Sequence, residues 1–303
     1  MYERITCAPR GPTLGRVDLL SLTGSLDAVV DPIIVLAFDG WTDAGRGGTL
    51  AAERLRELWP SEPVGRFDGD RLYDYRDRRP SLTIDEGVLG DPEWPSLTLH
   101  RIDLRTTHLL LIEGNEPDLS WRALCADVSE LALVTGATRY VGFGAVPAPV
   151  PHTRPVLVTT TSNRPDLVSR IGAPHVRLVV PASCQVVVET ALRDAGLLTL
   201  GLWARIPHYV AGEYPAAAAA VLRAFADYVE VDIDTSDLTS AALEHRDQLD
   251  LAARASDEIR EHIERLERGY DEDVTGLSAF MDLPTGDEIA AELERFLRRQ
   301  DRS

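Results

Sequence analysis

Short apolar runs alternate with amphipathic stretches of helix length over the first 230 residues, and this alternation restricts the fold more than any other feature. A brief apolar run bounded by turn residues is typical of a buried strand. A helix-length segment between two such runs is typical of the crossover in a parallel sheet. The pattern therefore predicts an α/β protein whose mostly parallel sheet is flanked by helices.

The clearest predicted strand, residues 32–38, begins with Pro32 and continues with six apolar residues into a glycine-rich loop. Further strands are predicted at residues 97–102, 108–113, 139–146, 156–160, 176–180 and 198–204. Helices are predicted at residues 49–58, 119–134, 183–195 and 215–228. Residues 67–95 are rich in Asp, Arg, Gly and Pro, a composition that favours loops with a short hairpin.

After residue 230 the strand pattern stops and a heptad repeat begins. Apolar and small residues recur at spacings of four and three from Leu238 to Tyr270, which is typical of a coiled-coil seam. Alanine, histidine and serine occupy the middle of this seam and bury little area. We therefore expect this helix to pack on the main domain, on a neighbouring subunit or on a short helix that follows it.

A capping box at residues 285–288 predicts that short helix, with Ile289, Leu293 and Phe296 on one side of it. We accordingly divide the chain into an α/β domain at residues 1–230 and an acidic helical hairpin at residues 231–303. Residues 230–303 hold 21 acidic residues and 9 arginines, so they contribute −12 of the net charge of −18.

Lysine is absent from the sequence, and all 31 basic residues are arginine. This absence excludes Schiff-base chemistry and a Walker-type nucleotide site, because each needs a lysine amine. The strongly negative charge disfavours nucleic-acid binding, which needs a basic surface. The three cysteines are scattered without metal-ligand spacing, which argues against a disulfide framework and a zinc site.

The apolar runs are too short to cross a bilayer, so we expect no membrane partner. The first ten residues include Glu3 and Arg4 and lack the apolar core of a signal peptide. We therefore expect a cytoplasmic protein.

Four segments together resemble the PAC2 family, which is named for a proteasome assembly chaperone. They are Asp39-Gly-Trp-Thr-Asp-Ala-Gly45, Val141-Gly-Phe-Gly-Ala145, Val150-Pro-His-Thr-Arg-Pro155 and Leu200-Gly-Leu-Trp-Ala-Arg-Ile-Pro-His-Tyr-Val210. The resemblance covers about residues 30–230 and is to the actinobacterial form with an acidic helical extension. It implies a fold similar to that of purine nucleoside phosphorylases, self-association and, as in related eukaryotic and archaeal proteins, binding to proteasome subunits.

The first candidate site is the loop after the strand at residues 32–38. Asp39, Trp41, Asp43, Gly45 and Arg46 lie in this loop, directly before a predicted helix. Free backbone amides at a helix N-terminus, together with the arginine, could hold a phosphate or a carboxylate. The alternative is a tight structural turn in which the two aspartates accept hydrogen bonds from nearby amides.

A second candidate site combines Glu113, at the end of a predicted strand, with His152 and Arg154. In a parallel sheet the carboxyl ends of the strands line the ligand crevice, so these residues and Asp39 could converge there. A carboxylate that orients a histidine suits acid–base work, and the arginine suits an anionic substrate. The alternative is a network that fixes proline-bounded loops or a subunit interface.

Residues 271–282 match an EF-hand loop in part, but Ser278 replaces an apolar residue and Asp282 replaces the usual glutamate. We therefore expect neither a metal ion nor a cofactor.

These observations favour a non-enzymatic protein-binding or assembly-chaperone-like protein. We expect it to act as a homo-oligomer, with proteasome subunits or another protein as partner. The alternative is an enzyme or small-molecule binder with a phosphorylase-like or hydrolase-like cleft for an anionic or nucleoside-like ligand. Actinobacterial members have also been labelled carboxylate–amine ligases, a label that the absence of lysine disfavours.

Overall fold

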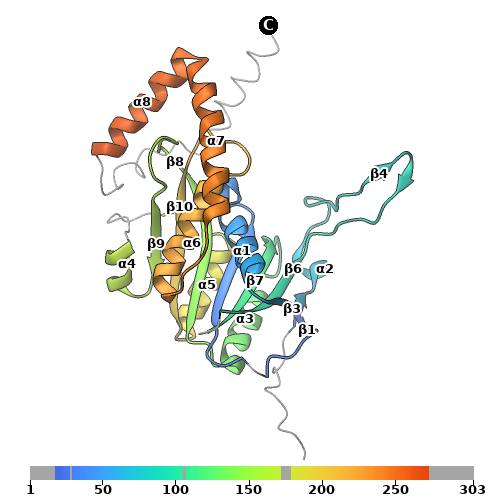
Figure 1. The fold of residues 1–303 in the computed structure, drawn as a ribbon. Coiled ribbons are helices and arrows are strands. Elements are labelled where there is room, and N and C mark those ends of the chain that lie inside the picture. Colours follow the sequence, from blue (N-terminus) through green and yellow to red (C-terminus); the bar gives the residue numbers. More distant parts are fainter. Residues whose placement is uncertain (1–17, 28, 105–106, 172–178, 273–303) are drawn as a thin grey trace, which may run out of the picture.

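The computed structural model describes residues 18–27, 29–104, 107–171 and 179–272. Its centre is a sheet in the order β1-β3-β6-β7-β2-β8-β10-β9 (Figure 1). The strands are β1 (Leu20–Leu22), β2 (Ile33–Asp39), β3 (Ser61–Phe67), β6 (Leu97–Asp103), β7 (His108–Asn115), β8 (Arg139–Ala148), β9 (Val158–Ser162) and β10 (Leu198–Pro207).

The sheet is parallel at its centre and antiparallel at both sides. Strands β7, β2, β8 and β10 all run in the same direction. The pairs β1–β3, β3–β6, β6–β7 and β10–β9 are antiparallel. The predicted parallel arrangement therefore describes the four central strands, whose carboxyl ends meet at one edge of the sheet.

Helices cover both faces of the sheet because the central strands bury side chains on both sides. In β2, Ile33 and Val35 pack toward helices α1 (Gly47–Leu58) and α6 (Pro215–Val229). Ile34 and Leu36 belong to the core on the other face, toward α3 (Trp121–Thr135) and α5 (Cys184–Asp194). Each of these fully buried side chains contributes about 1.5–3 kcal/mol of transfer free energy.

Shorter elements complete the α/β part. They are a 3₁₀ turn η1 (Ala44–Arg46), α2 (Gly69–Leu72), α4 (Pro165–Ile171) and a hairpin of β4 (Ile84–Asp85) with β5 (Val88–Leu89). The hairpin projects away from the body of the molecule (Figure 1). This confirms the hairpin predicted within residues 67–95.

The heptad region forms two helices, α7 (Ser236–Arg254) and α8 (Asp257–Glu272), so the prediction of one continuous helix is wrong. The chain turns between them at residues 255–256 (Figure 1). Part of the predicted seam faces the rest of the chain: Leu238 and Leu249 pack against the core cluster of the α1 and α6 face, and Ile263 is buried. Ala252 and Ile259 of the same seam are exposed. Intramolecular packing therefore covers only part of the seam. The division at residue 230 stays a prediction.

The other predicted helices and strands are present, with boundaries within three residues of the prediction. The exception is the segment at 176–180: residues 176–178 lie outside the described residues, and residues 179–180 belong to no strand. The short helix predicted after residue 285 also lies outside the described residues. Of the helices in the described ranges, none combines the length and the apolar character needed to cross a bilayer.

Candidate functional site

The parallel centre of the sheet brings four connecting segments to one edge. They follow the carboxyl ends of β2, β7, β8 and β10 and contain most of the predicted site residues. In sheets of this kind ligands bind at such an edge. Here the two C-terminal helices also reach this edge, through contacts with the segments after β8 and β10.

The Asp43 side chain caps the free backbone amides at the N-terminus of helix α1. Its buried carboxylate accepts hydrogen bonds from the amides of Gly48 (2.6 Å) and Thr49 (3.1 Å), and from the Thr49 hydroxyl. Burial raises the pKa of Asp43 to about 6, while these three donors oppose the shift. Two amides that could have held a phosphate are therefore already bonded within the chain, as the structural alternative for this loop described.

Gly45 and Arg46 fix the loop against the segment after β10. Gly45 has a φ of 61°, and a Cβ there would lie 2.8 Å from the Tyr214 Cβ, so only glycine fits. Arg46 forms ion pairs with Glu53 (2.8 Å) and with Glu213. The one basic side chain of the predicted anion site is thus neutralised by two carboxylates.

Glu116 has the same role at helix α5, although it was not among the residues predicted from the sequence. Its carboxylate accepts hydrogen bonds from the amides of Cys184 (2.8 Å) and Trp41 (2.9 Å). Gly40 permits this approach, since a Cβ there would lie 2.4 Å from the Glu116 Cβ. The only signal in the sequence is the position of Glu116 directly after a strand. Burial raises the pKa of the Cys184 thiol, so this cysteine is poorly suited to act as a nucleophile.

Asp39 and Trp41 complete the loop. Asp39 ends β2 and is half-buried, and its carbonyl accepts a hydrogen bond from the Glu116 amide. Trp41 is 61% exposed, although its backbone is held by Glu116. The loop thus presents an aromatic ring to solvent on a fixed backbone.

Glu113 is separate from the other candidates. Among the described residues, its carboxylate pairs with Arg56 of α1 (2.5 Å) and His100 of β6 (3.2 Å), not with His152 or Arg154. Burial and the neighbouring Arg56 lower the pKa of His100 to about 4, so this histidine is neutral at pH 7. The predicted convergence with Glu113 therefore does not occur through direct contacts.

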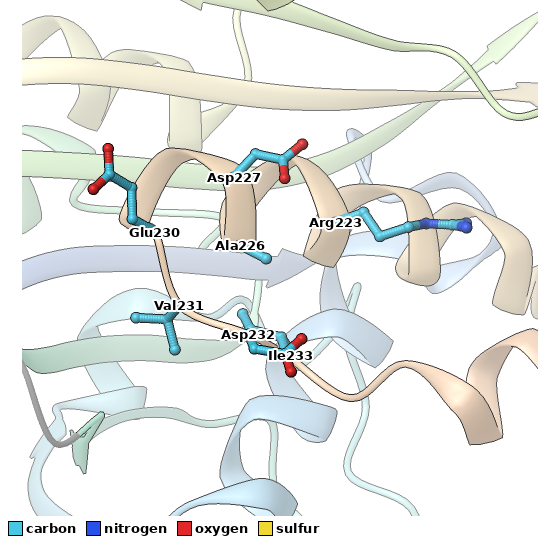
Figure 2. A pocket seen from close by; sticks show the side chains of 7 residues that line it. All are labelled: Arg223, Ala226, Asp227, Glu230, Val231, Asp232 and Ile233. Atoms are coloured by element: carbon cyan, nitrogen blue, oxygen red, sulfur yellow. The ribbon is translucent and has the colours of Figure 1, made fainter.

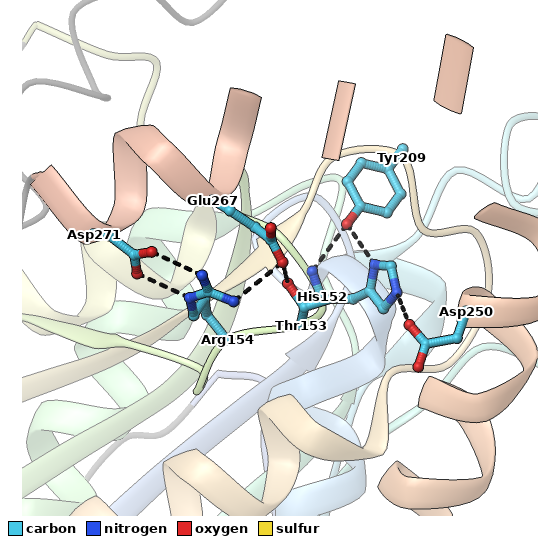
Figure 3. Close-up of polar contacts among 7 residues, drawn as sticks. All are labelled: His152, Thr153, Arg154, Tyr209, Asp250, Glu267 and Asp271. Atoms are coloured by element: carbon cyan, nitrogen blue, oxygen red, sulfur yellow. Dashed lines mark hydrogen bonds and ion pairs between the residues drawn. The ribbon is translucent and has the colours of Figure 1, made fainter. Parts of the chain in front are cut away.

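His152 lies at the centre of a hydrogen-bonded chain (Figure 3). The Tyr209 hydroxyl lies 2.8 Å from the His152 amide and 2.7 Å from Nδ1, and the Asp250 carboxylate lies 3.1 Å from Nε2. The hydroxyl accepts from the amide and donates to Nδ1, so the Nε2 hydrogen points to Asp250. The His152 side chain is only 1% exposed.

Arg154 holds helix α8 (Figure 3). Its guanidinium donates two hydrogen bonds to Asp271 (2.8 and 2.7 Å) and a third to Glu267 (3.1 Å). Thr153 also donates to Glu267, and the Tyr270 hydroxyl donates to the Pro155 carbonyl (3.0 Å). These contacts raise the pKa of Arg154 and lower that of Asp271. Nothing in the sequence pattern points to these acidic partners, which lie more than 90 residues from the segment at 152–154 in the chain.

A shallow pocket of about 440 Å³ lies elsewhere, at the C-terminal end of α6 (Figure 2). It is lined by Arg223, Ala226, Asp227, Glu230, Val231, Asp232 and Ile233. No group of three or more histidine, cysteine or acidic side chains in the described part of the chain could hold a metal ion.

The polar side chains at the carboxyl edge thus bond mainly to one another. Two helix N-termini are occupied by carboxylates, and His152 and Arg154 tie the α/β part to α7 and α8. Tyr209, His152 and Asp250 have the donor and acceptor order of an acid–base relay, but α7 supplies the aspartate and the histidine is buried.

The sheet topology and the contacts at the carboxyl edge together define an α/β protein with a mixed sheet. Helices of the same chain cover this carboxyl edge. The sequence model of the PAC2 family matches residues 37–253. The chain belongs to the PAC2 family.

Solved structures agree with this assignment. A Mycobacterium tuberculosis protein of unknown function, Rv2714, is 32% identical and has a TM-score of 0.78, with 88% of this chain and 93% of that chain covered. A Corynebacterium glutamicum protein of unknown function is 28% identical, with a TM-score of 0.78 and coverages of 84% and 98%. A Mycobacterium tuberculosis proteasome-assembly chaperone homologue, Rv2125, is 28% identical, with a TM-score of 0.70 and coverages of 76% and 99%. No curated protein matches the chain.

Proposed function

We propose that this protein is a non-enzymatic, assembly-chaperone-like binding protein that acts in the cytoplasm as a homo-oligomer. The observation that carries the proposal is a contrast between two parts of its surface. The edge where an α/β enzyme would bind its ligand is filled by the protein's own side chains. Exposed apolar side chains gather instead on the projecting hairpin.

The filled edge argues against an anionic substrate. An incoming phosphate would have to displace Asp43 from α1 or Glu116 from α5, and each carboxylate accepts hydrogen bonds from two backbone amides. Arg46 and Arg154 are both paired with two acidic residues. Neither of these two arginines is left free to bind a substrate.

The hairpin supports self-association. Ile84, Val88 and Leu89 are 63%, 70% and 68% exposed. Ile84 pairs with Leu89 across the two strands, so the apolar side chains are close neighbours. A two-stranded hairpin is marginally stable in water on its own, and these side chains would gain stability by burial against another surface. We infer that this surface belongs to a second copy of the chain.

Proteasome subunits are the proposed heterologous partner. The proposal is supported by family membership and by the 28% identity to a protein described as a proteasome-assembly chaperone homologue. The net charge of −18 suits a partner with a basic surface, because complementary charge speeds encounter and disfavours wrong partners.

Self-association is tested by replacing Ile84, Val88 and Leu89 with serine. We expect light scattering after size exclusion to show a lower mass than for wild type, because the apolar contact is lost. Leu243→Ser with Leu251→Ser, which changes exposed leucines of α7, is the matched control and should leave the mass unchanged. An unchanged mass in the hairpin variant, or an equal change in the control, would contradict the proposal.

Partner binding is tested separately with purified proteasome α subunits at low and high salt. We expect co-elution with wild type at low salt and weaker co-elution at high salt, since the attraction is partly electrostatic. Absence of co-elution at both salt concentrations would remove proteasome subunits as partner.

The hydrogen-bonded chain of Tyr209, His152 and Asp250 favours a second candidate, a binder of a nucleoside-like ligand. Calorimetric titration with adenosine, with and without phosphate, tests it. Binding by wild type that His152→Gln abolishes would support this candidate, and no heat with wild type would remove it.

A further inference from the structure

The tip of the β4–β5 hairpin combines apolar and acidic side chains on an exposed part of the chain. Every residue from 81 to 94 is exposed, including Ile84, Val88 and Leu89. This stretch holds no basic residue and four acidic ones, which are Asp85, Glu86, Asp91 and Glu93. A surface that receives such a tip needs an apolar centre with positive groups beside it.

The turn at the tip is tight and fixes the place of the acidic residues. Asp85 pairs with Val88, so Glu86 and Gly87 form the turn between the two strands. Glu86 and Gly87 have φ of 47° and 86°, as a type I′ turn requires. Two acids therefore lie at the end of the hairpin, directly beside its apolar residues.

The start of α3 offers an apolar side chain beside two guanidinium groups. Leu119, which lies just before the helix, is 48% exposed. Its amide donates to the Leu72 carbonyl (2.9 Å), and the Ser120 hydroxyl donates to the Arg71 carbonyl (2.9 Å), so the two segments run side by side. Arg71 and Arg122 are both exposed. Within the described ranges, neither of them forms an ion pair with a carboxylate.

Acidic residues near this surface are engaged within their own chain. Asp118 pairs with Arg78 (3.4 Å). Asp70 accepts a hydrogen bond from the Tyr75 hydroxyl (2.9 Å), and Asp68 caps α2. The positive charge of the two exposed arginines is therefore not cancelled by an ion pair in this part of the described chain.

The N-terminus of α3 adds positive charge to the same surface. Ser120 precedes the helix with a φ of 57°, and its side chain forms no capping hydrogen bond with it. The first turn of α3 holds no acidic residue, whereas Asp43 and Glu116 supply carboxylates to α1 and α5. The first amides of a helix lack partners within the helix, so an acidic group is stabilised at this end.

We propose that the hairpin tip of one copy docks on the start of α3 in a second copy. This contact rests on the proposed self-association and names the surface that receives the hairpin. The apolar side chains of the tip pack on Leu119, and the two acids at its end face Arg71, Arg122 and the first amides of α3. The hairpin projects away from the body of its own chain, so the contact joins two copies (Figure 1). Each copy has one tip and one receiving surface, and both are used in a closed assembly.

The first test exchanges charges between the two surfaces. Arg71→Glu with Arg122→Glu, and Asp85→Arg with Glu86→Arg, each bring like charges together in the contact. Each pair of substitutions should lower the mass measured by light scattering after size exclusion. A variant with all four substitutions has opposite charges again and should recover the mass of wild type. Urea unfolding shows whether every variant is folded.

Arg254→Glu with Arg268→Glu is the matched control, because it makes the same change of charge on exposed residues of α7 and α8. Its mass should equal that of wild type. A folded variant with all four substitutions that keeps the lower mass would overturn the contact, and so would an equal loss of mass in the control.

The second test does not depend on charge. A variant with Val88→Cys and Leu119→Cys is treated with oxidised glutathione, and disulfide-linked copies are measured on denaturing gels without reductant. A disulfide forms only where two Cα atoms approach within about 7 Å. The control replaces Leu119→Cys with Leu133→Cys, an exposed position near the other end of α3. We expect about fivefold more linked product with Leu119→Cys, because docking raises the effective concentration of the two thiols. Equal yields would overturn the contact.

These outcomes separate the receiving surface from self-association itself. If wild type is monomeric, both proposals fail. If wild type is oligomeric, but the Arg71→Glu, Arg122→Glu variant keeps its mass and the two cross-linking yields are equal, only the surface at α3 is removed. The serine substitutions in the hairpin then still test its role in self-association.

Discussion

The two halves of the carboxyl edge are closed in different ways. On the side of β2 and β7, Asp43 and Glu116 accept hydrogen bonds from backbone amides at the start of α1 and α5. On the side of β8 and β10, His152 and Arg154 meet side chains of α7 and α8. The first half is closed by the α/β fold itself, and the second by helices that follow it in the chain.

This difference separates permanent from reversible closure. A buried carboxylate on backbone amides can leave only if the helix N-terminus is exposed or rearranged, so its loss affects the whole domain. Half-exposed side chains on a separate helix can part while the domain stays folded. Substitutions in the first half should therefore change the free energy of unfolding of the whole domain, and substitutions in the second half should change the local opening of α7 and α8.

Replacing Asp43 with alanine should lower the free energy of unfolding by about 3 kcal/mol. The variant loses three hydrogen bonds and leaves the amides of Gly48 and Thr49 without their carboxylate, and cap and buried hydrogen-bond losses are of this size. Urea unfolding followed by circular dichroism measures the change.

Asp39→Ala is the matched control, because Asp39 belongs to the same loop and is less buried. We expect a change below about 0.5 kcal/mol there. Equal destabilisation by the two variants would contradict the view that amide contacts at α1 close this half of the edge.

Glu189 can be compared with Asp43 and Glu116, because it is a third buried carboxylate and its hydrogen-bond donor is a side-chain hydroxyl rather than backbone amides at a helix N-terminus. It lies on α5, is 7% exposed and accepts from the Thr161 hydroxyl at 3.0 and 3.1 Å. Burial raises its pKa from 4.5 to about 7. Since the folded state holds this proton more tightly than the unfolded chain, Glu189 costs the protein stability as the pH rises from about 4.5 to 7.

Glu189→Gln should therefore stabilise the protein by about 2 kcal/mol at pH 8 and by almost nothing at pH 4.5. Urea unfolding of variant and wild type at both pH values measures the difference. Asp194→Asn, which changes an exposed acid at the end of the same helix, serves as control. A stabilisation that is equal at both pH values would show that the carboxylate charge is not its cause.

Much of the α/β part could be predicted because its strands are buried on both faces and separated by amphipathic helices. The strand at residues 32–38 is an example, since its six apolar residues alternate between two cores. Strand β3 could not be predicted in this way: Pro63 and Gly65 interrupt it, and its register shifts between them. The interruption of the helix between α7 and α8 at residues 255–256 could not be predicted either, because the heptad spacing continues through these residues.

The candidate site was predictable in position but not in partners. Loops after parallel strands meet at one edge, so Asp39 and the segment with His152 and Arg154 lie at this edge, while their role in ligand binding stays a prediction. Their bonding depends on residues far along the chain, and nothing in the sequence pairs Arg154 with Asp271. Glu113 was misplaced because its side chain points from β7 toward α1, where Arg56 holds it.

Arg154→Ala should have the smallest global effect and the clearest local one. Its partners Glu267 and Asp271 lie on α8, and the pairs are partly exposed, so the midpoint of urea unfolding should stay nearly unchanged. Amides of α8 should exchange about fivefold faster, because the bidentate contact no longer holds the end of the helix.

Arg260→Ala is the control, since Arg260 pairs within α8 with Asp257 and does not reach the α/β part. If the variant instead lowered the midpoint as much as Asp43→Ala, both halves of the edge would belong to one cooperative unit, and closure by the C-terminal helices would be as permanent as closure by the α/β fold.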